Sequence, residues 1–311
     1  MSGNNIIRFL KGGKGVALIP LLCCIFFIIP IALFSGEKLK HIATVYGDKI
    51  SKPFNQPSSL FFDESKQRFY IADTRNNRLV SFDSAYSYIS EFSAGKSMKL
   101  PISIVKDNKG RLIITEGQKN QVTIINIKKK SLNPLDLSKV PKNHSIIPGN
   151  LAIDKKDNLY VIDRANKRIL VFNNKDKYIR EITVKKGLAG FNDVKVDIHG
   201  NLYAIDALKG RIYIFNQKGK SLAKFGKLGQ SEGDFGFPIS LAVDKRGLIY
   251  VLDRHKNRIF VYNKEGDFLE GHLQLGWQKE GLYYPTYIFI NQSQLIFIVD
   301  RDNNRIQVYK R

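Results

Sequence analysis

Cysteine is absent from the chain after residue 24. Both cysteines, Cys23 and Cys24, lie in an apolar run near the N-terminus. A disulfide framework and a cysteine-bound zinc site are therefore excluded from residues 25–311. A domain without cysteine suits an oxidising compartment.

Acidic residues are scarce. The 311 residues contain 50 Lys and Arg against 28 Asp and Glu, and the formal net charge is +22. Such a surface favours nucleic acid, anionic lipid, anionic polysaccharide or acidic protein as a partner. A general richness in lysine, unrelated to any partner, explains the same excess equally well.

Motifs for catalysis and metal binding are also missing. The chain has no G-x-S-x-G elbow, no Walker loop and no H-E-x-x-H pair. Its five histidines have neither zinc spacing nor a cysteine partner; they are His41, His144, His199, His255 and His272. We therefore predict no catalytic residue, no metal and no cofactor.

Residues 15–35 carry no charge and are mostly apolar. About 20 apolar residues cross a hydrocarbon core as a helix, so the run predicts a transmembrane signal-anchor. Three basic residues precede it, which makes residues 1–14 a basic cytoplasmic tail and places residues 36–311 outside the cytoplasm, periplasmic or extracellular. A signal peptide cleaved near Ser35 and a lipoprotein anchored at Cys23 are alternatives, and both export the remaining chain.

One spacing recurs along residues 36–311: an acid is followed five residues later by an arginine. Successive acids lie 43 or 47 residues apart, and self-similarity at such a period indicates a repeat architecture. The complete pairs are Asp73 and Arg78, Asp163 and Arg168, Asp206 and Arg211, Asp253 and Arg258, and Asp300 and Arg305. Glu116 and Gln121 occupy the same places in a sixth, degraded copy.

Each repeat consists of strand signals separated by turn signals. In residues 238–262, a first β-branched run ends at Asp244 and a second ends at Asp253. A third run begins at Arg258, and a fourth, less regular run follows in most copies. Four strands in roughly 45 residues predict the blades of a β-propeller, with an open β-solenoid as the alternative.

Four stretches share a closer pattern around the acid and the arginine. They are IADTRNNRLVSF at 71–82, VIDRANKRILVF at 161–172, VLDRHKNRIFVY at 251–262 and IVDRDNNRIQVY at 298–309. This pattern resembles the NHL-repeat family, and so does the glycine-rich approach to a proline at 225–238. The resemblance implies an all-β fold, a six-bladed β-propeller, over residues 36–311. The second repeat departs most from the pattern, which makes its outer strand uncertain.

The two ends of the repeat region predict how the ring closes. The last repeat stops at Arg311, directly after its third strand. Residues 41–47 read as an orphan outer strand. We predict that this N-terminal strand completes the last blade, because closure removes open sheet edges.

The acid and the arginine of each pair flank a four-residue turn. A hairpin brings them together, so the carboxylate can accept turn amides and a guanidinium fork. We predict a structural ion pair at each complete repeat rather than a catalytic carboxylate.

These turns should emerge on one face of the ring and carry an excess of cations. The candidate binding residues are Arg75, Lys119, Arg164, Lys167, Lys209, Arg254, Lys256 and Arg301. Single-stranded nucleic acid would need aromatic side chains beside these cations; the turns contain none, and an exported domain would not meet RNA. An acidic protein, an anionic glycan or an anionic headgroup is the expected partner.

The central channel is the other candidate site. Residues expected at its mouth are Ser59, Ser103, Asn150, Asp193, Ser240 and Tyr287. Only one is an acid, which is a poor ligand set for a divalent cation. We predict a membrane-tethered NHL β-propeller that binds a protein or ligand through its basic face. The alternative is a propeller enzyme of the lyase or lactonase type acting at the channel.

Overall fold

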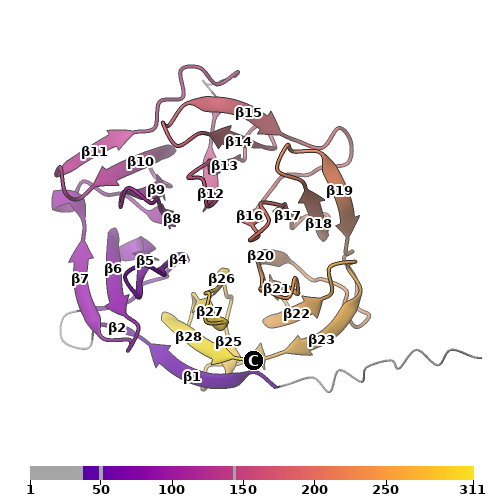
Figure 1. The fold of residues 1–311 in the computed structure, drawn as a ribbon. Coiled ribbons are helices and arrows are strands. Elements are labelled where there is room, and N and C mark those ends of the chain that lie inside the picture. The colour runs from indigo at the N-terminus through magenta and orange to yellow at the C-terminus, as the bar shows by residue number, and fades with distance from the viewer. Residues whose placement is uncertain (1–37, 49–51, 143–144) are drawn as a thin grey trace, which may run out of the picture. The chain divides into compact units, whose positions relative to one another are not determined.

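The computed structural model describes residues 38–48, 52–142 and 145–311, and shows a six-bladed β-propeller (Figure 1). The predicted cytoplasmic tail and transmembrane segment, residues 1–14 and 15–35, lie outside the described residues. Within the described part, no helix is long and apolar enough to cross a membrane.

Each blade is a four-stranded antiparallel sheet, with its first strand next to the channel. Blade one contains β4 (Ser59–Asp63), β5 (Arg68–Asp73), β6 (Arg78–Asp83) and β7 (Tyr88–Phe92). Blade two contains β8 (Pro101–Lys106), β9 (Leu112–Glu116), β10 (Gln121–Asn126) and β11 (Ser131–Pro134). Blade three contains β12 (Pro148–Ile153), β13 (Leu159–Asp163), β14 (Arg168–Phe172) and β15 (Tyr178–Ile182). The outer strand left uncertain in the second repeat is therefore present, although it is short.

The C-terminal half repeats the arrangement. Blade four contains β16 (Asp193–Val196), β17 (Leu202–Asp206), β18 (Arg211–Phe215) and β19 (Ser221–Phe225). Blade five contains β20 (Pro238–Val243), β21 (Ile249–Asp253), β22 (Arg258–Tyr262) and β23 (Phe268–His272). Blade six contains β26 (Tyr287–Ile290), β27 (Leu295–Asp300), β28 (Arg305–Lys310) and, as its outer strand, β1 (Lys40–Val45). Two short two-stranded sheets lie within loops: β2 (Gly47–Asp48) pairs with β3 (Lys52–Pro53), and β24 (Gln274–Leu275) pairs with β25 (Gly281–Leu282).

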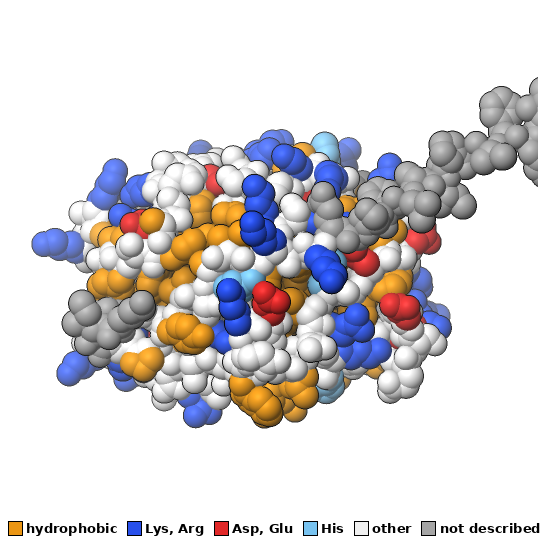
Figure 2. Space-filling model, turned by 90° about the horizontal axis from the view of Figure 1, so that it is seen from below, with side chains coloured by type: hydrophobic (Ala, Val, Ile, Leu, Met, Phe, Trp, Pro, Cys, Tyr) orange, Lys and Arg blue, Asp and Glu red, His pale blue; other side chains and the backbone are white. Residues whose placement is uncertain are grey.

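The core lies between the blades. The second and third strands are buried along nearly their whole length, as in β13 and β14. A sheet covered on both faces needs continuous apolar runs rather than alternation, and this is what the repeats contain. Outer strands such as β19 are mostly exposed, which explains their weaker sequence signal. Figure 2 shows the outer edge of the ring on the side of blade six, where apolar patches lie between Lys and Arg side chains.

The N-terminal strand closes the ring, as predicted. β1 pairs with β28 in an antiparallel register that matches Thr44 with Gln307 and Val45 with Ile306. Val45 is buried among blade-six and blade-one side chains, including Val308 and Phe54. Strands 260 residues apart in the chain thus share one sheet.

Antiparallel pairing gives the ring two different faces. At one end of the strands lie the turns between second and third strands together with the loops that lead from one blade to the next; we call this the upper face. At the other end lie the turns between first and second strands and those between third and fourth strands, which together form the lower face.

Because β1 closes the ring, we predict that two substitutions in this strand have unequal effects on stability. Val45→Ala should lower the free energy of unfolding by about 2 kcal/mol, because it removes buried methyl groups from the closing contact. Ile42→Ala should change it by less than about 0.5 kcal/mol, because Ile42 is 40% exposed. Urea unfolding followed by circular dichroism measures both, and equal effects would contradict the closing role of Val45.

Candidate functional site

The repeat acids hold the loops of the upper face. All six acids are buried, including Glu116 of the degraded copy. Each accepts a backbone N–H from the loop that leads into its own blade. The bonds are Asn55 N to Asp73 (2.8 Å), Lys99 N to Glu116 (2.9 Å), Ile147 N to Asp163 (3.3 Å), Ala189 N to Asp206 (2.6 Å), Gly236 N to Asp253 (2.7 Å) and Tyr283 N to Asp300 (2.7 Å). The acid therefore fixes the position of the loop as well as its own turn.

The arginine completes this arrangement in blades one, three and six. Nε donates to the carboxylate at 2.8 Å in Arg78–Asp73, Arg168–Asp163 and Arg305–Asp300. Nη2 of each arginine donates to a loop carbonyl, as in Arg168 Nη2 to Pro141 O at 2.6 Å. Burial raises the pKa of Asp300 above its usual value, and loop and side-chain donors including Arg305 oppose that rise.

The ion pairs expected in blades four and five do not form in the structure. Asp206 and Arg211, and likewise Asp253 and Arg258, are opposite each other across their turns, but no ion pair joins them in the described chain. Two neighbouring positions differ: the first separates blades one, three and six from blades four and five, and the second separates blades one and three from blades four and five.

The first position lies three residues after the acid. In blades one, three and six it holds asparagine, whose side-chain N–H donates to the same carboxylate oxygen as the arginine. In blades four and five it holds Lys209 and Lys256, and Lys256 Nζ instead donates to Asp234 O at 2.7 Å. The second position lies on the outer strand. Arg78 and Arg168 each contact a glutamate there, Glu91 and Glu181, whereas blades four and five have Lys224 and Gly271.

The predicted binding cations lie on the upper face but differ in their solvent exposure and in their partners. Arg75, Arg164, Lys167 and Lys209 are exposed, and none has an ion-pair partner among the described residues. Lys119 is paired with Glu116 at 2.9 Å, and Arg301 with Asp302 at 2.9 Å. Arg254 and Lys256 are half-buried and donate to backbone carbonyls.

The loops between blades add cations that the repeat pattern did not indicate. They lie at the same end of the strands as the turns, because each outer strand ends there and each inner strand begins there. Their exposed lysines are Lys52, Lys96, Lys99, Lys139, Lys142, Lys185, Lys186, Lys227 and Lys279. Their acids are Asp136, Glu232, Asp234 and Glu280. The upper face is therefore more basic than its turns alone predicted.

The residues expected at the channel mouth lie between the blades instead. Ser59, Ser103, Asp193, Ser240 and Tyr287 are buried, and only Asn150 is partly exposed. Their side chains point toward a neighbouring blade, and several form hydrogen bonds with the inner strand of that blade. The reason is that successive side chains of a strand point to opposite faces of its sheet, and each face packs against a neighbouring blade. These residues form a seam between blades rather than an open polar rim.

Asp193 is the centre of this seam. Its carboxylate accepts hydrogen bonds from Ser240 Oγ (2.6 Å), Asn150 Nδ2 (3.0 Å) and Leu241 N (3.1 Å). Lys195 Nζ lies 2.5 Å from Asp193 Oδ2 and 4.0 Å from the centre of the Tyr287 ring. Burial lowers the pKa of Lys195, opposed by Asp193. Asp193 and Lys195 therefore form a buried acid–amine pair on an inner strand.

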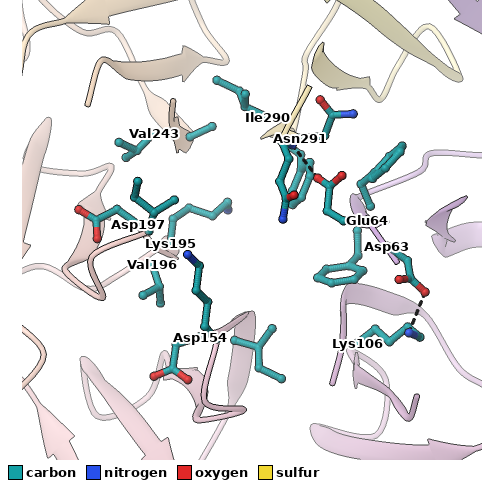
Figure 3. A pocket seen from close by; sticks show the side chains of 18 of the residues that line it. Asp63, Glu64, Lys106, Asp154, Lys195, Val196, Asp197, Val243, Ile290 and Asn291 are labelled. Atoms are coloured by element: carbon teal, nitrogen blue, oxygen red, sulfur yellow. Dashed lines mark hydrogen bonds and ion pairs between the residues drawn. The ribbon is translucent and has the colours of Figure 1, made fainter. Parts of the chain in front are cut away.

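Lys195 of this pair also lines a cavity of about 700 Å³ on the lower face (Figure 3). Lys195 and Glu64 lie on opposite sides of it, and apolar residues such as Val196, Val243 and Ile290 line it. Most of its carboxylates are already engaged: Asp63 binds Lys106 at 2.7 Å, and Asp154 accepts the amides of its own turn. The cavity can hold a small molecule, with the Lys195 amine as its distinctive group.

The described residues contain no group of three or more His, Cys, Asp or Glu side chains placed to hold a metal ion. No histidine lines the lower cavity. His255 stacks on Phe237 (4.9 Å), and His272 lies 3.2 Å from Glu270 on an outer strand. His144 is outside the described residues.

The fold is shared with proteins of known structure. The DUF5128 family model, described as a 6-bladed beta-propeller, matches residues 191–309. Selenomethionine-substituted virginiamycin B lyase from Staphylococcus aureus is 13% identical, with a TM-score of 0.61 over 82% of this chain and 80% of that chain. A gluconolactonase from Xanthomonas campestris is 12% identical, with a TM-score of 0.67 over 89% and 95%.

An auxiliary nutrient binding protein from Bacteroides ovatus is 14% identical, with a TM-score of 0.63 over 82% of this chain and 69% of that chain. At these identities the likeness shows the fold alone. A comparison with curated proteins gives no significant match.

The difference between blades three and four predicts unequal effects of the same substitution. Arg168→Met should lower the free energy of unfolding by about 3–5 kcal/mol, because it leaves a buried carboxylate without its partner. Arg211→Met should lower it by less than about 1 kcal/mol, since Arg211 forms no ion pair with Asp206 in the described chain. Denaturant unfolding of both variants checks the ranking, and an equal loss would show that the ion pair is not what stabilises blade three.

Proposed function

We propose that the protein is a membrane-tethered propeller of the NHL type, displayed outside the cytoplasm, that binds an anionic partner through its upper face. The observation that carries the proposal is the set of exposed cations Arg75, Arg164, Lys167 and Lys209, which have no acidic partner among the described residues. Cations that serve only to stabilise the fold would be paired, as Arg168 is.

The distribution of acids on this face supports the same conclusion. The repeat acids are buried and bonded to amides and, in three blades, to a buried guanidinium. They therefore offer no exposed carboxylate to an approaching partner, whereas the turn and loop cations face solvent. A potential of one sign over a surface attracts partners of the other sign and speeds their encounter.

The tether and the location rest on the sequence. The uncharged run at 15–35 and the basic residues before it support a signal-anchor with the propeller outside. An exported domain meets acidic proteins, anionic glycans and anionic headgroups, and these remain the partner classes of this proposal.

A second candidate function is an enzyme of the lyase or lactonase type at the channel. One observation favours it: the buried Asp193–Lys195 pair lies next to a cavity large enough for a small molecule. A lactonase and a lyase are also among the structures with this fold. Lactone hydrolysis or lyase activity that Lys195→Met abolishes, and that Lys155→Met on the cavity rim retains, would support this candidate over the first.

Charge reversal on one blade tests the binding proposal. Arg164→Glu with Lys167→Glu changes the upper face of blade three, and Lys155→Glu with Lys156→Glu makes the same charge change on its lower face. The first variant should elute from an immobilised polyanion, such as heparin, at a clearly lower salt concentration than the second, because only the upper-face cations contact the matrix. Identical elution of both variants would show that attraction depends on net charge and not on this face.

A further inference from the structure

An aromatic cluster lies on the upper face at the junction of blades five and six. The loop of residues 273–286 carries Trp277, Tyr283 and Tyr284. Trp277 is 69% exposed and Tyr284 is 42% exposed. The ring centres of Trp277 and Tyr283 are 5.7 Å apart, and those of Tyr283 and Tyr284 are 5.2 Å apart. The cluster presents adjoining aromatic rings to solvent on this face.

The backbone beneath this cluster is fixed. Tyr283 N donates to the repeat acid Asp300, and Arg305 donates to Trp277 O at 3.0 Å. Asn303 Nδ2 reaches Gly276 O at 3.0 Å, and the β24–β25 ribbon joins the two ends of the loop's central part. Aromatic groups held in this way lose little conformational freedom when a ligand binds them.

Two arginines come from turns that contact the backbone of this loop. Arg254 Nε donates to Pro285 O at 3.4 Å, and its Cζ lies 5.9 Å from the Phe237 ring centre. Arg254 has no carboxylate partner among the described residues, while the neighbouring Arg301 is paired with Asp302. Burial and then the charge of Arg301 lower the pKa of Arg254. A bound anion would relieve this unfavourable arrangement.

We propose that this junction, formed by Trp277, Tyr283 and Tyr284 with Arg254 and Arg301, is a subsite for an acidic saccharide. The exposed aromatic faces would pack against the apolar face of a sugar ring, and the Arg254 guanidinium would receive its carboxylate or sulfate. This inference rests on the proposed function, because it names the class of anion and the part of the upper face that recognises it.

The arrangement favours a saccharide over the other anions. An acidic peptide or a lipid headgroup needs the cations alone, and the exposed cations of blades one, three and four would serve it equally well. Single-stranded nucleic acid uses aromatic platforms and cations together, but the predicted location outside the cytoplasm does not supply it. An acidic saccharide uses both the rings and the guanidinium at this one junction.

Trp277 is the only tryptophan, so its fluorescence reports binding at this site directly. The full chain in a non-ionic detergent is titrated with oligogalacturonate and with sulfated heparin fragments. Neutral dextran, poly-glutamate, a single-stranded oligonucleotide and anionic lipid vesicles are titrated in parallel. We expect saturable change of Trp277 emission with an acidic saccharide at concentrations where the other ligands give none.

Two variants and one matched control locate the site. Arg254→Gln and Tyr284→Ala should each weaken acidic-saccharide binding about tenfold. Lys156→Gln, which removes an exposed cation from the lower face of blade three, should weaken it less than about twofold. Thermal unfolding of each variant verifies that the propeller is intact.

The outcomes separate this inference from the proposed function. If poly-glutamate, vesicles or the oligonucleotide bind as well as the saccharides, and Tyr284→Ala has no effect, the saccharide subsite is wrong and the basic binding face stands. If polyanion binding depends on Arg164 and Lys167 but not on Arg254 and Tyr284, the same conclusion holds. If no anion binds to any part of the upper face, both proposals are wrong.

Discussion

The propeller depends on one buried hydrogen bond that recurs in all six blades. In each blade a carboxylate at the end of the second strand accepts a backbone N–H from the loop that leads into that blade. A buried N–H without a partner costs more than a bonded one gains, so a loop that lacked this acceptor would not be held against the sheet. The degraded repeat keeps this bond through Glu116 and dispenses with the arginine. The acid is therefore the constant element and the guanidinium an addition.

This bond also determines the electrostatics of the upper face. An acid that must sit beneath a loop cannot also face solvent, so the carboxylate charge of every repeat is withdrawn from the surface. The turn residues that follow the acid, such as Arg75 and Arg164, remain outside. The loops that the acids hold bring further lysines to the same face. A basic face thus results from the way the fold uses its acids, in addition to the lysine-rich composition.

The sequence allowed the blades, their order and the closing strand to be predicted, because each rests on a repeated pattern or on an unpaired strand at a chain end. The five arginine pairs were predicted as equivalent, and two of them were wrong. The distinguishing signal was present in the turns: DTRNNR, DRANKR and DRDNNR place asparagine three residues after the acid, while DALKGR and DRHKNR place lysine there. The inner-strand residues were harder to place. Whether Ser59 or Asp193 faces the channel or the next blade depends on strand tilt, which no local pattern encodes.

The cations of the upper face divide into two kinds that differ in exposure and contacts. Arg164 and Lys167 extend into solvent, where their attraction is long-ranged, easily screened by salt and tolerant of the partner's shape. Arg254 is half-buried between a carbonyl and an aromatic ring, where a contact is short-ranged and depends on the shape of the ligand. If the upper face binds an anion as proposed, the exposed cations would raise the rate of encounter and the junction of blades five and six would determine which ligand stays bound. A ring of nearly equivalent blades would then be specific because one of its junctions, with its long aromatic loop, differs from the rest.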